Sequence, residues 1–182
     1  MSRNVRGSLF VDYVRMLRLR KDVDWSNWLL PTDVPYLAGK IDKTAWYPME
    51  TFERMGLAIL KEIANEELTL VEAFGRMSVD GLLAQYPALL VPGDPRETMM
   101  RFQALQRGFF DFPAFDVVEI GDHAAQIRID YQMSARAEEA ACNQAVGFFD
   151  RLLELAGAKD RSVKLVSRRW ASEPTTTVVM RY

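Results

Sequence analysis

Cysteine and histidine each occur once in this chain of 182 residues, as Cys142 and His123. A single cysteine excludes an intramolecular disulfide and a metal site built from several thiolates. A single histidine excludes zinc sites that need two histidines. The glycine-rich phosphate loop, the dinucleotide-binding glycine fingerprint and the Gly-x-Ser-x-Gly elbow are also missing. The sequence therefore lacks the residues for many metal-dependent and nucleophilic mechanisms.

Long apolar runs and a strong charge imbalance are missing as well. No stretch approaches the roughly 20 apolar residues that span a membrane, and the polar start at 1–7 is not a signal peptide. We therefore expect a cytoplasmic protein without a membrane span. The net charge of −2 argues against bulk nucleic-acid affinity. The basic run Arg15, Arg18, Arg20 and Lys21 is more simply a solvated helix face, with weak nucleic-acid contact as the alternative.

What is present is typical of a folded domain. Apolar residues make up 49% of the chain and aromatic residues 11%, which is too many for a disordered chain. A length of 182 residues fits one domain that buries a core without disulfides. We expect a single domain over residues 1–182, with a helical part at 1–113 and a sheet-plus-helix part at 114–182.

Apolar residues in the first part recur every three to four positions, as on one face of a helix. Thr69 and Glu72 form a capping-box pattern, and Asp94 precedes Pro95 as an N-cap. A loop-rich segment, 22–47, holds three of the four tryptophans. The pattern predicts four or five helices, four of them near residues 8–20, 48–64, 69–86 and 94–109.

The period of the apolar residues changes after Pro113. Ala125, Ile127 and Ile129 alternate with polar residues, as in a strand with one buried face. We expect one long helix at 134–156 and two pairs of strands at 115–120, 125–131, 162–170 and 175–182. Strands that follow helices along the chain favour an α+β fold. The predicted architecture is a helical part followed by ββαββ, a four-stranded and largely antiparallel sheet covered by the long helix.

The few residues that could carry catalysis have no suitable partners. His123 follows Gly121 and Asp122 in a predicted hairpin turn, where it would face solvent. Cys142 lies among small residues on the long helix, which favours a buried and inert thiol. Neighbouring acids such as Glu138 and Glu139 point in different directions on a helix. We therefore expect no enzymatic activity and no metal or cofactor.

Methionine and phenylalanine residues are the most prominent feature of the helical part. The chain has nine methionines and ten phenylalanines. Methionine adapts to varied apolar partners, and ligand cavities are lined mainly by apolar side chains with few polar groups. Ordinary core packing is the simpler explanation for any single one of these residues. Together they are compatible with either a solid core or a pocket between helices.

Four short motifs carry a resemblance to a known family: Gly7–Phe10, Trp46–Pro48, Phe74–Ser78 and Leu155–Ala158. Together with the ββαββ order, they resemble a paralogous family of small proteins abundant in myxobacteria. That family is similar in turn to vinyl-reductase-type (4VR) ligand domains, to the haem–nitric-oxide-binding fold and to vesicle-tethering TRAPP subunits. The resemblance spans nearly the whole chain, and none of its motifs is catalytic.

The resemblance implies a helical N-terminal part, an antiparallel sheet, a dimer and a cavity for a small molecule. Two features of the related sensors do not carry over. Many have cysteines around the last two strands that can hold metal, whereas residues 167–175 contain none here. The haem branch needs a histidine on a helix, whereas His123 falls in a predicted turn.

We interpret the chain as a non-enzymatic ligand-binding or sensory domain that acts as a homodimer. Its ligand would be a small apolar molecule, because an apolar patch this rich needs a ligand or a partner to cover it. The alternative is an interaction module without a ligand, which would dock a protein partner through the first helix and the tryptophan-containing segment. The predicted ligand-binding residues are five in the pocket wall and two at its edge: Phe52, Met55, Met77, Phe102 and Phe109, and Trp46 and Tyr47.

Overall fold

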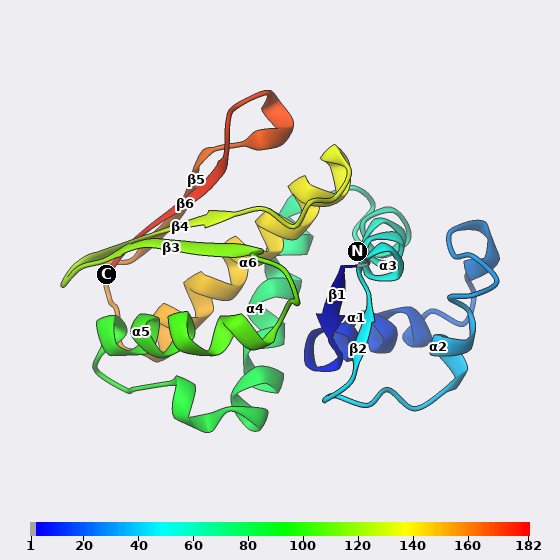
Figure 1. Ribbon diagram of the computed structural model, residues 1–182, viewed down its shortest axis with the longest axis horizontal. Helices are drawn as coiled ribbons and strands as arrows, with labels where there is room; N and C mark the ends of the chain where they lie inside the picture. Colours follow the sequence, from blue (N-terminus) through cyan, green and yellow to red (C-terminus); the bar gives the residue numbers. More distant parts are fainter. Residues whose placement is uncertain (1–2) are drawn as a thin grey trace.

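The computed structural model describes residues 3–182 and arranges them as two lobes (Figure 1). The helical lobe holds two short strands and three helices: β1 (Asn4–Arg6), α1 (Gly7–Leu19), α2 (Pro35–Ala38), β2 (Trp46–Pro48) and α3 (Met49–Glu62). The sheet lobe holds three more helices and four strands: α4 (Leu68–Gln85), α5 (Pro95–Leu105), β3 (Phe115–Ile120), β4 (Ala124–Ile129), α6 (Ala135–Leu155), β5 (Ser162–Ser167) and β6 (Thr176–Arg181).

The larger sheet confirms the predicted α+β fold class. Its strand order is β3-β4-β6-β5, and every neighbouring pair is antiparallel. The alternation on β4 buries Ala125, Ile127 and Ile129, and Val178 and Met180 of β6 are buried beside them. α6 runs along the sheet, with α5 near β3 and α4 packed on α6 (Figure 1). The long helix between two strand pairs is therefore where the sequence predicted it.

The helix starts were predicted with mixed success. Asp94 caps α5 as expected, since its Oδ1 accepts the backbone N–H of Glu97 at 2.8 Å. The capping box at Thr69 is wrong, because α4 begins at Leu68 and its N-cap residue, Glu67, makes no side-chain capping hydrogen bond. An acid three residues after a threonine is thus a weaker signal than an Asp-Pro pair, whose proline restricts where the helix can begin.

The sequence does not predict the small sheet of the helical lobe. β1 pairs with β2 in antiparallel register, with Val5 opposite Tyr47. Trp46 and Tyr47 therefore belong to a strand rather than to the loop predicted for residues 22–47. Each strand is three residues long, which is too short for alternation to be recognised.

The basic residues near the N-terminus are engaged within the fold. The Arg18 guanidinium donates to the carbonyl oxygens of Leu37 at 2.6 Å and Tyr36 at 3.0 Å, which ties α2 to α1. Arg20 pairs with Asp22 at 2.8 Å. These contacts support a structural role for the two arginines. In the part of the chain that the structure describes, no helix has the length and apolarity to cross a membrane.

α4 and α6 cross closely because each presents a glycine at the contact. A β-carbon on Gly75 would lie 1.9 Å from the carbonyl oxygen of Gln144, and one on Gly147 would lie 1.9 Å from that of Glu72. Such a distance is far inside van der Waals contact, so only glycine lets the two backbones approach in this way. The crossing fixes the position of α6 between α4 and the sheet.

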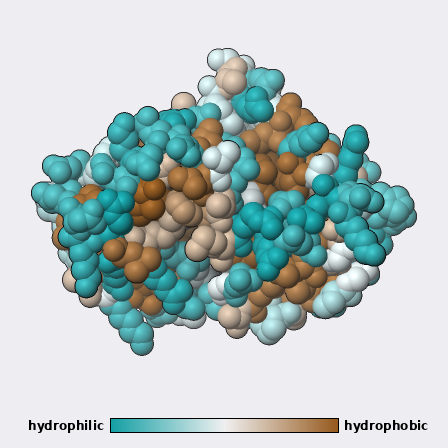
Figure 2. Space-filling model, turned by 180° about the vertical axis from the view of Figure 1, so that it is seen from behind, coloured by the Kyte–Doolittle hydropathy of each residue, from teal (hydrophilic) through white to brown (hydrophobic). Residues whose placement is uncertain are grey.

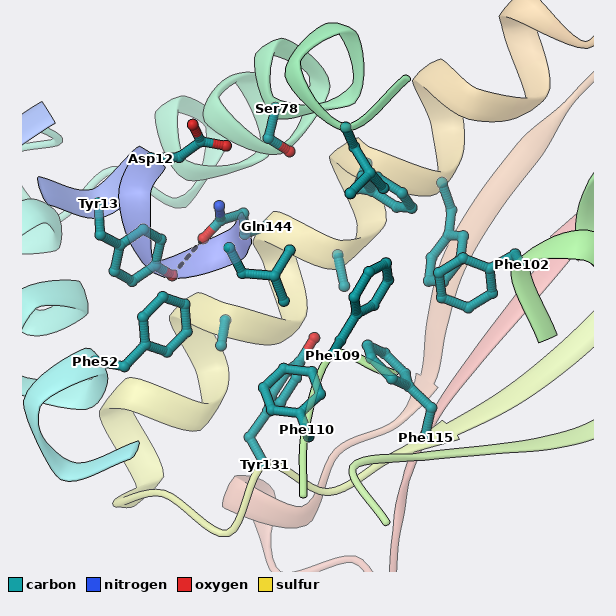
Figure 3. A pocket seen from close by; sticks show the side chains of 16 residues that line it. Asp12, Tyr13, Phe52, Ser78, Phe102, Phe109, Phe110, Phe115, Tyr131 and Gln144 are labelled. Carbon is teal, nitrogen blue, oxygen red and sulfur yellow. Dashed lines mark hydrogen bonds between the residues drawn. The ribbon is translucent and has the colours of Figure 1, made fainter. Parts of the chain in front are cut away.

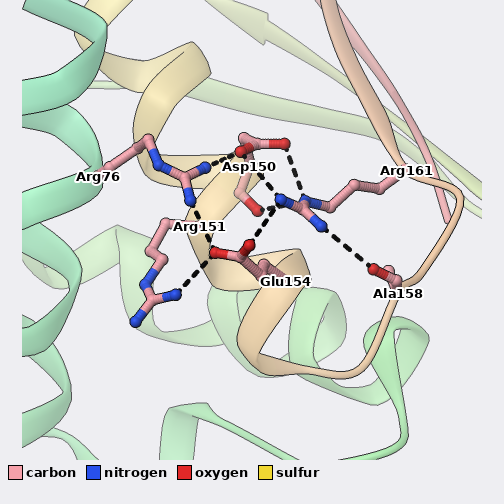
Figure 4. A network of polar contacts seen from close by, with 6 residues as sticks. All are labelled: Arg76, Asp150, Arg151, Glu154, Ala158 and Arg161. Atoms are coloured by element: carbon pink, nitrogen blue, oxygen red, sulfur yellow. Dashed lines mark hydrogen bonds and ion pairs between the residues drawn. The ribbon is translucent and has the colours of Figure 1, made fainter.

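An ion-pair network links this helix pair to the sheet (Figure 4). Arg76 of α4 pairs with Asp150 and, at 2.7 Å, with Glu154, both on α6. Arg161, just before β5, pairs with the same two acids at 2.9 Å each. Arg151 adds a further contact to Glu154 at 2.7 Å. The two shared carboxylates therefore hold α4, α6 and the start of β5 together.

We expect this network to give the protein acid-sensitive stability. Arg151, together with Arg161 and Arg76, lowers the pKa of Glu154 to about 2, from 4.5 for an unperturbed glutamate. Because the unfolded chain binds this proton first, the contribution of Glu154 is present above pH 4.5 and is lost as the pH falls towards 2. Urea unfolding at several pH values should show that Glu154→Gln flattens this part of the stability profile.

The matched control is Glu119→Gln, which changes an exposed glutamate of β3 that has no ion pair among the described residues. Its stability profile should follow that of the wild type. Identical slopes for Glu154→Gln and the wild type between about pH 4.5 and 2 would contradict the prediction.

Candidate functional site: a cavity between the lobes

An apolar cavity of about 100 Å³ lies between the two lobes (Figure 3). α1 and α3 form its wall on the side of the helical lobe. α4, α5 and α6 form most of the opposite wall, with the segment around 109–115 and Tyr131 completing it. The lining is mainly aromatic, and its polar groups belong to five residues: Asp12, Tyr13, Ser78, Tyr131 and Gln144.

Ring contacts explain why this space is not filled. Phe102 meets Phe149 edge-on with the ring centroids 4.9 Å apart, and it meets Phe115 in the same way at 5.7 Å. On the side of the helical lobe, Tyr13 stacks on Phe52 at 4.1 Å. Aromatic rings are flat and rigid, so rings fixed by these contacts do not bend into the remaining space. The cavity is therefore preformed, as small-molecule sites usually are.

Two tyrosine hydroxyls reach the cavity, and they differ in their partners. The Tyr13 hydroxyl donates to Oε1 of Gln144 at 2.6 Å. Tyr131 is only 7% exposed, and its hydroxyl makes no hydrogen bond with the described residues. Figure 3 shows this hydroxyl directed towards the middle of the lining side chains. Burial raises the pKa of both phenols, so both remain protonated and able to donate.

The segment that carries Tyr131 is fixed by charged side chains. Glu138, buried in the first turn of α6, accepts the backbone N–H groups of Tyr131 at 2.8 Å and Met133 at 3.0 Å. Arg3 donates to the carbonyl oxygens of Tyr131, at 3.1 Å, and Gln132. Gln132 has a φ of 57°, which gives the segment a tight turn. These contacts to the backbone on either side therefore hold the Tyr131 side chain in position.

Asp12 is the charged residue of the cavity lining. Its side chain is 30% exposed, and its ion-pair partner Arg15, one turn along α1, is 3.4 Å away and itself 60% exposed. Burial raises the pKa of Asp12, and the more weakly acting charges of Arg15 and Lys43 oppose the shift. Asp12 is thus a half-buried carboxylate with loose pairing.

The structure brings together three of the predicted ligand-binding residues. Phe52, Phe102 and Phe109 line the same cavity. Met55 does not, because it lies one turn farther along α3 and is fully buried in the core. That the three phenylalanines contact a ligand stays a prediction.

Met77, Trp46 and Tyr47 are not where the prediction put them. Met77 is 72% exposed, because α4 turns Gly75 towards α6 and a residue two positions farther is rotated by about 200° from it. Trp46 lies on the surface beneath the Arg6 guanidinium. Tyr47 stacks on Phe10 of α1, with the ring centroids 4.5 Å apart. None of the three lines the cavity, since β2 positions the two aromatic residues at the far side of α1.

The two most reactive side-chain types lie outside the cavity. His123 is exposed in the turn between β3 and β4, as the sequence predicted. Cys142 is fully buried on α6, and burial raises the pKa of its thiol, which agrees with the expected buried and inert cysteine. Within residues 3–182, no group of three or more histidine, cysteine and acidic side chains could hold a metal ion.

The sequence did not predict that polar side chains would line the cavity. Gln144 carried a weak signal, because a polar residue between Ala141 and Ala145 interrupts the inner face of the long helix. Asp12 lies directly before Tyr13 at the border of the apolar stripe, where acids are common on any surface helix. Their convergence depends on contacts between separate elements, which no local pattern records.

Comparison with solved structures identifies the class of fold as that of haem–nitric-oxide-binding (H-NOX) domains. One similar structure comes from a study of haem redox potential and protein-induced porphyrin distortion, with a TM-score of 0.60, 11% identity, and coverage of 97% of this chain and 99% of that one. Another is an H-NOX protein mutant from K. algicida in its Fe(II) unliganded form, with a TM-score of 0.59, 12% identity, and coverage of 97% and 95%.

Comparisons of sequence identify no relative. No family model matches the sequence, and the search of curated proteins found no match. The similarity to H-NOX domains at these identities concerns the fold alone. The narrower resemblance to a myxobacterial family stays a prediction.

The residues of the cavity do not fit haem. An engineered cavity of about 150 Å³ holds benzene, so a space of about 100 Å³ is far too small for a porphyrin. Among the described residues, the lining contains no histidine, cysteine or methionine, and its tyrosines are kept protonated by burial rather than available as phenolate ligands. It also contains no lysine or arginine to pair with propionates. The fold is shared with haem proteins, but the site has a different chemistry.

Proposed function

We propose that the chain is a non-enzymatic module that binds a small, largely apolar molecule in the cavity between its lobes. The apolar cavity carries this proposal, because the rigid rings that form its wall leave a space of about 100 Å³ between the lobes. The hydroxyl of Tyr131 reaches this space and could donate to a ligand that has an acceptor there. The aromatic lining supplies the apolar contact.

The size of the cavity restricts the ligand. Because about 150 Å³ accommodates benzene, a cavity of about 100 Å³ suits a smaller apolar group, such as an isopropyl group. A larger ligand would place only its end there. The fold supports a binding role, since similar structures include an H-NOX protein described by its unliganded Fe(II) state. A sensory role and a homodimer belong to the same proposal.

We expect xenon, an apolar probe that enters dry cavities, to bind in this one. The chemical shifts of methyl groups that line it, such as those of Leu82, should change with xenon pressure. Ala145→Leu adds three carbons to the lining and should abolish the effect. The control Ala104→Leu, at an exposed position of α5, should bind xenon like the wild type.

The outcome that would contradict the proposal is a wild type whose lining methyl groups do not respond to xenon. Equal responses in the wild type and in a folded Ala145→Leu variant would also contradict it, because xenon would then bind elsewhere. Circular dichroism should establish that both variants fold, since overpacking costs about 1–3 kcal/mol.

A second candidate function is the docking of a protein partner without a ligand. The segment from the end of α1 to α2 exposes large apolar side chains, with Leu19 82%, Leu30 50% and Val34 41% exposed. Figure 2 shows several apolar areas between hydrophilic ones on the side opposite to Figure 1. Native mass spectrometry separates the candidates, because bound small molecules add mass that is lost on denaturation. A protein without extra mass that retains a protein partner would favour docking.

A further inference from the structure

One end of the cavity is polar. Asp12 of α1, Ser78 of α4 and Gln144 of α6 line this end, and Figure 3 shows them on the same side of the labelled aromatic residues. All three are partly accessible to solvent, so this end forms the mouth of the cavity. A ligand with an apolar body in the cavity would place its polar group among these side chains.

The hydrogen bonds within the mouth determine which kind of polar group it can accept. Ser78 donates its hydroxyl proton to the carbonyl oxygen of Gly75 at 2.7 Å, which leaves the Ser78 oxygen as an acceptor. Tyr13 donates its proton to Gln144 and likewise keeps an acceptor oxygen. The Asp12 carboxylate accepts only, when it is ionised. Acceptors therefore outnumber donors, and the amide of Gln144 supplies the remaining N–H groups.

The charge at the mouth also favours a ligand whose polar group donates hydrogen bonds. No lysine or arginine is among the described residues that line the cavity, so a carboxylate or phosphate on a ligand would meet the negative charge of Asp12, while the nearby cations Arg15 and Lys43 lie outside the lining. Arg15 is paired with Asp12 at 3.4 Å but lies mostly in solvent. A half-buried carboxylate with so loose a partner gains from a further donor that carries positive charge.

We propose that the mouth recognises the ammonium group of a small primary amine whose apolar part occupies the cavity. An ammonium group has three donors and no acceptor, which matches the acceptors of Asp12, Ser78 and Tyr13. This inference rests on the proposed function, because it names the chemical class of the ligand that the cavity takes. Asp12 is the residue that sets the preference for a cation.

A series of ligands with one apolar body tests the inference. The probes are 3-methylbutan-1-amine, 3-methylbutan-1-ol and 3-methylbutanoate, titrated by NMR at about pH 8, well above the usual range of a carboxyl pKa. We expect the amine to bind at least about tenfold more tightly than the alcohol, as charge-assisted hydrogen bonds do, and the carboxylate not to bind.

Variants assign the preference to Asp12. Asp12→Asn should weaken binding of the amine about tenfold and change binding of the alcohol less than about twofold, because the amide keeps the shape and loses the charge. The control Asp80→Asn removes an exposed carboxylate of α4 outside the cavity lining and should leave both affinities unchanged.

The outcomes for the amine and for the cavity are distinguishable. Binding of xenon and of the alcohol with no preference for the amine would overturn the inference and leave the proposed function intact. Failure of xenon and all three probes to bind the wild type would overturn both. An equal loss of amine affinity in Asp12→Asn and Asp80→Asn would mean that net charge, not the mouth, attracts the amine. The comparison of ligands in the wild type does not depend on the stability of any variant.

Discussion

Gly147→Ala is expected to destabilise the protein by about 3 kcal/mol. A β-carbon at this position would lie 1.9 Å from the carbonyl oxygen of Glu72 and 2.7 Å from its carbonyl carbon, so the backbones of α4 and α6 must separate. Overpacking of a core costs about 1–3 kcal/mol and occasionally more, and here the obstacle is backbone rather than a flexible side chain. The loss should outweigh the gain of about 1 kcal/mol that alanine brings to a helix interior.

Urea unfolding measures this effect, and thermal unfolding should show a fall in Tm of about 6–12 °C for a chain of this length. Gly81→Ala on α4 is the matched control. Its β-carbon would have a nearest neighbour at 3.9 Å, an oxygen of Asp12, which is an ordinary contact. That variant should be as stable as the wild type or gain up to about 1 kcal/mol. If both variants change stability alike, the close crossing does not limit residue size.

The crossing of α4 and α6 also positions one wall of the cavity. Ser78 and Leu82 of α4 and Gln144 and Phe148 of α6 belong to this wall, and Gly147 lies between the latter two on the same helix. A separation of the two helices would therefore move these four side chains relative to one another. The glycines connect packing to the candidate site because they determine how closely these two helices approach.

Much of the architecture could be predicted from local pattern. The alternation on β4 and the long apolar stripe of α6 are each set by contact with one neighbouring layer, so periodicity records them. The pairing of β1 with β2 could not be predicted, because its three-residue strands lie far apart in the chain. Which face of α4 packs on α6 could not be predicted from the sequence either. Its glycine contact with α6, rather than its most apolar side chains, decides that Met77 faces solvent.

The candidate site was less predictable than the fold. Composition was compatible with an apolar pocket, and three of the predicted residues, Phe52, Phe102 and Phe109, line the cavity, because large aromatic residues gather wherever the core is thick. The polar groups that give the cavity its chemistry come from separate elements. The sequence pattern predicts Tyr131 as one more inward residue of a strand, and only tertiary contacts show that its hydroxyl has no partner among the described residues.

Glu138→Ala is expected to destabilise the protein by about 3 kcal/mol and to release Tyr131 from its position. The Glu138 carboxylate is 3% exposed and accepts two backbone N–H groups, those of Tyr131 and Met133. Alanine leaves the buried N–H of Tyr131 and the partly buried N–H of Met133 without this partner, and a buried donor without a partner costs about 1–3 kcal/mol. Glu138→Gln should lose less, because its amide oxygen can still accept one of the two.

Hydrogen exchange at the amides of Tyr131 and Met133 tests the local part of this prediction, and urea unfolding tests the global part. Both amides should exchange faster in Glu138→Ala, and the response of the cavity to xenon should weaken because the Tyr131 ring is no longer fixed. The neighbouring Glu139 is the control: it pairs at 2.5 Å with Arg136 at the surface, where such pairs contribute about 0–1 kcal/mol. Slow exchange at both amides in a folded Glu138→Ala variant would show that other contacts, such as those of Arg3 and Asp130, hold the segment, and the cavity would then not depend on the carboxylate.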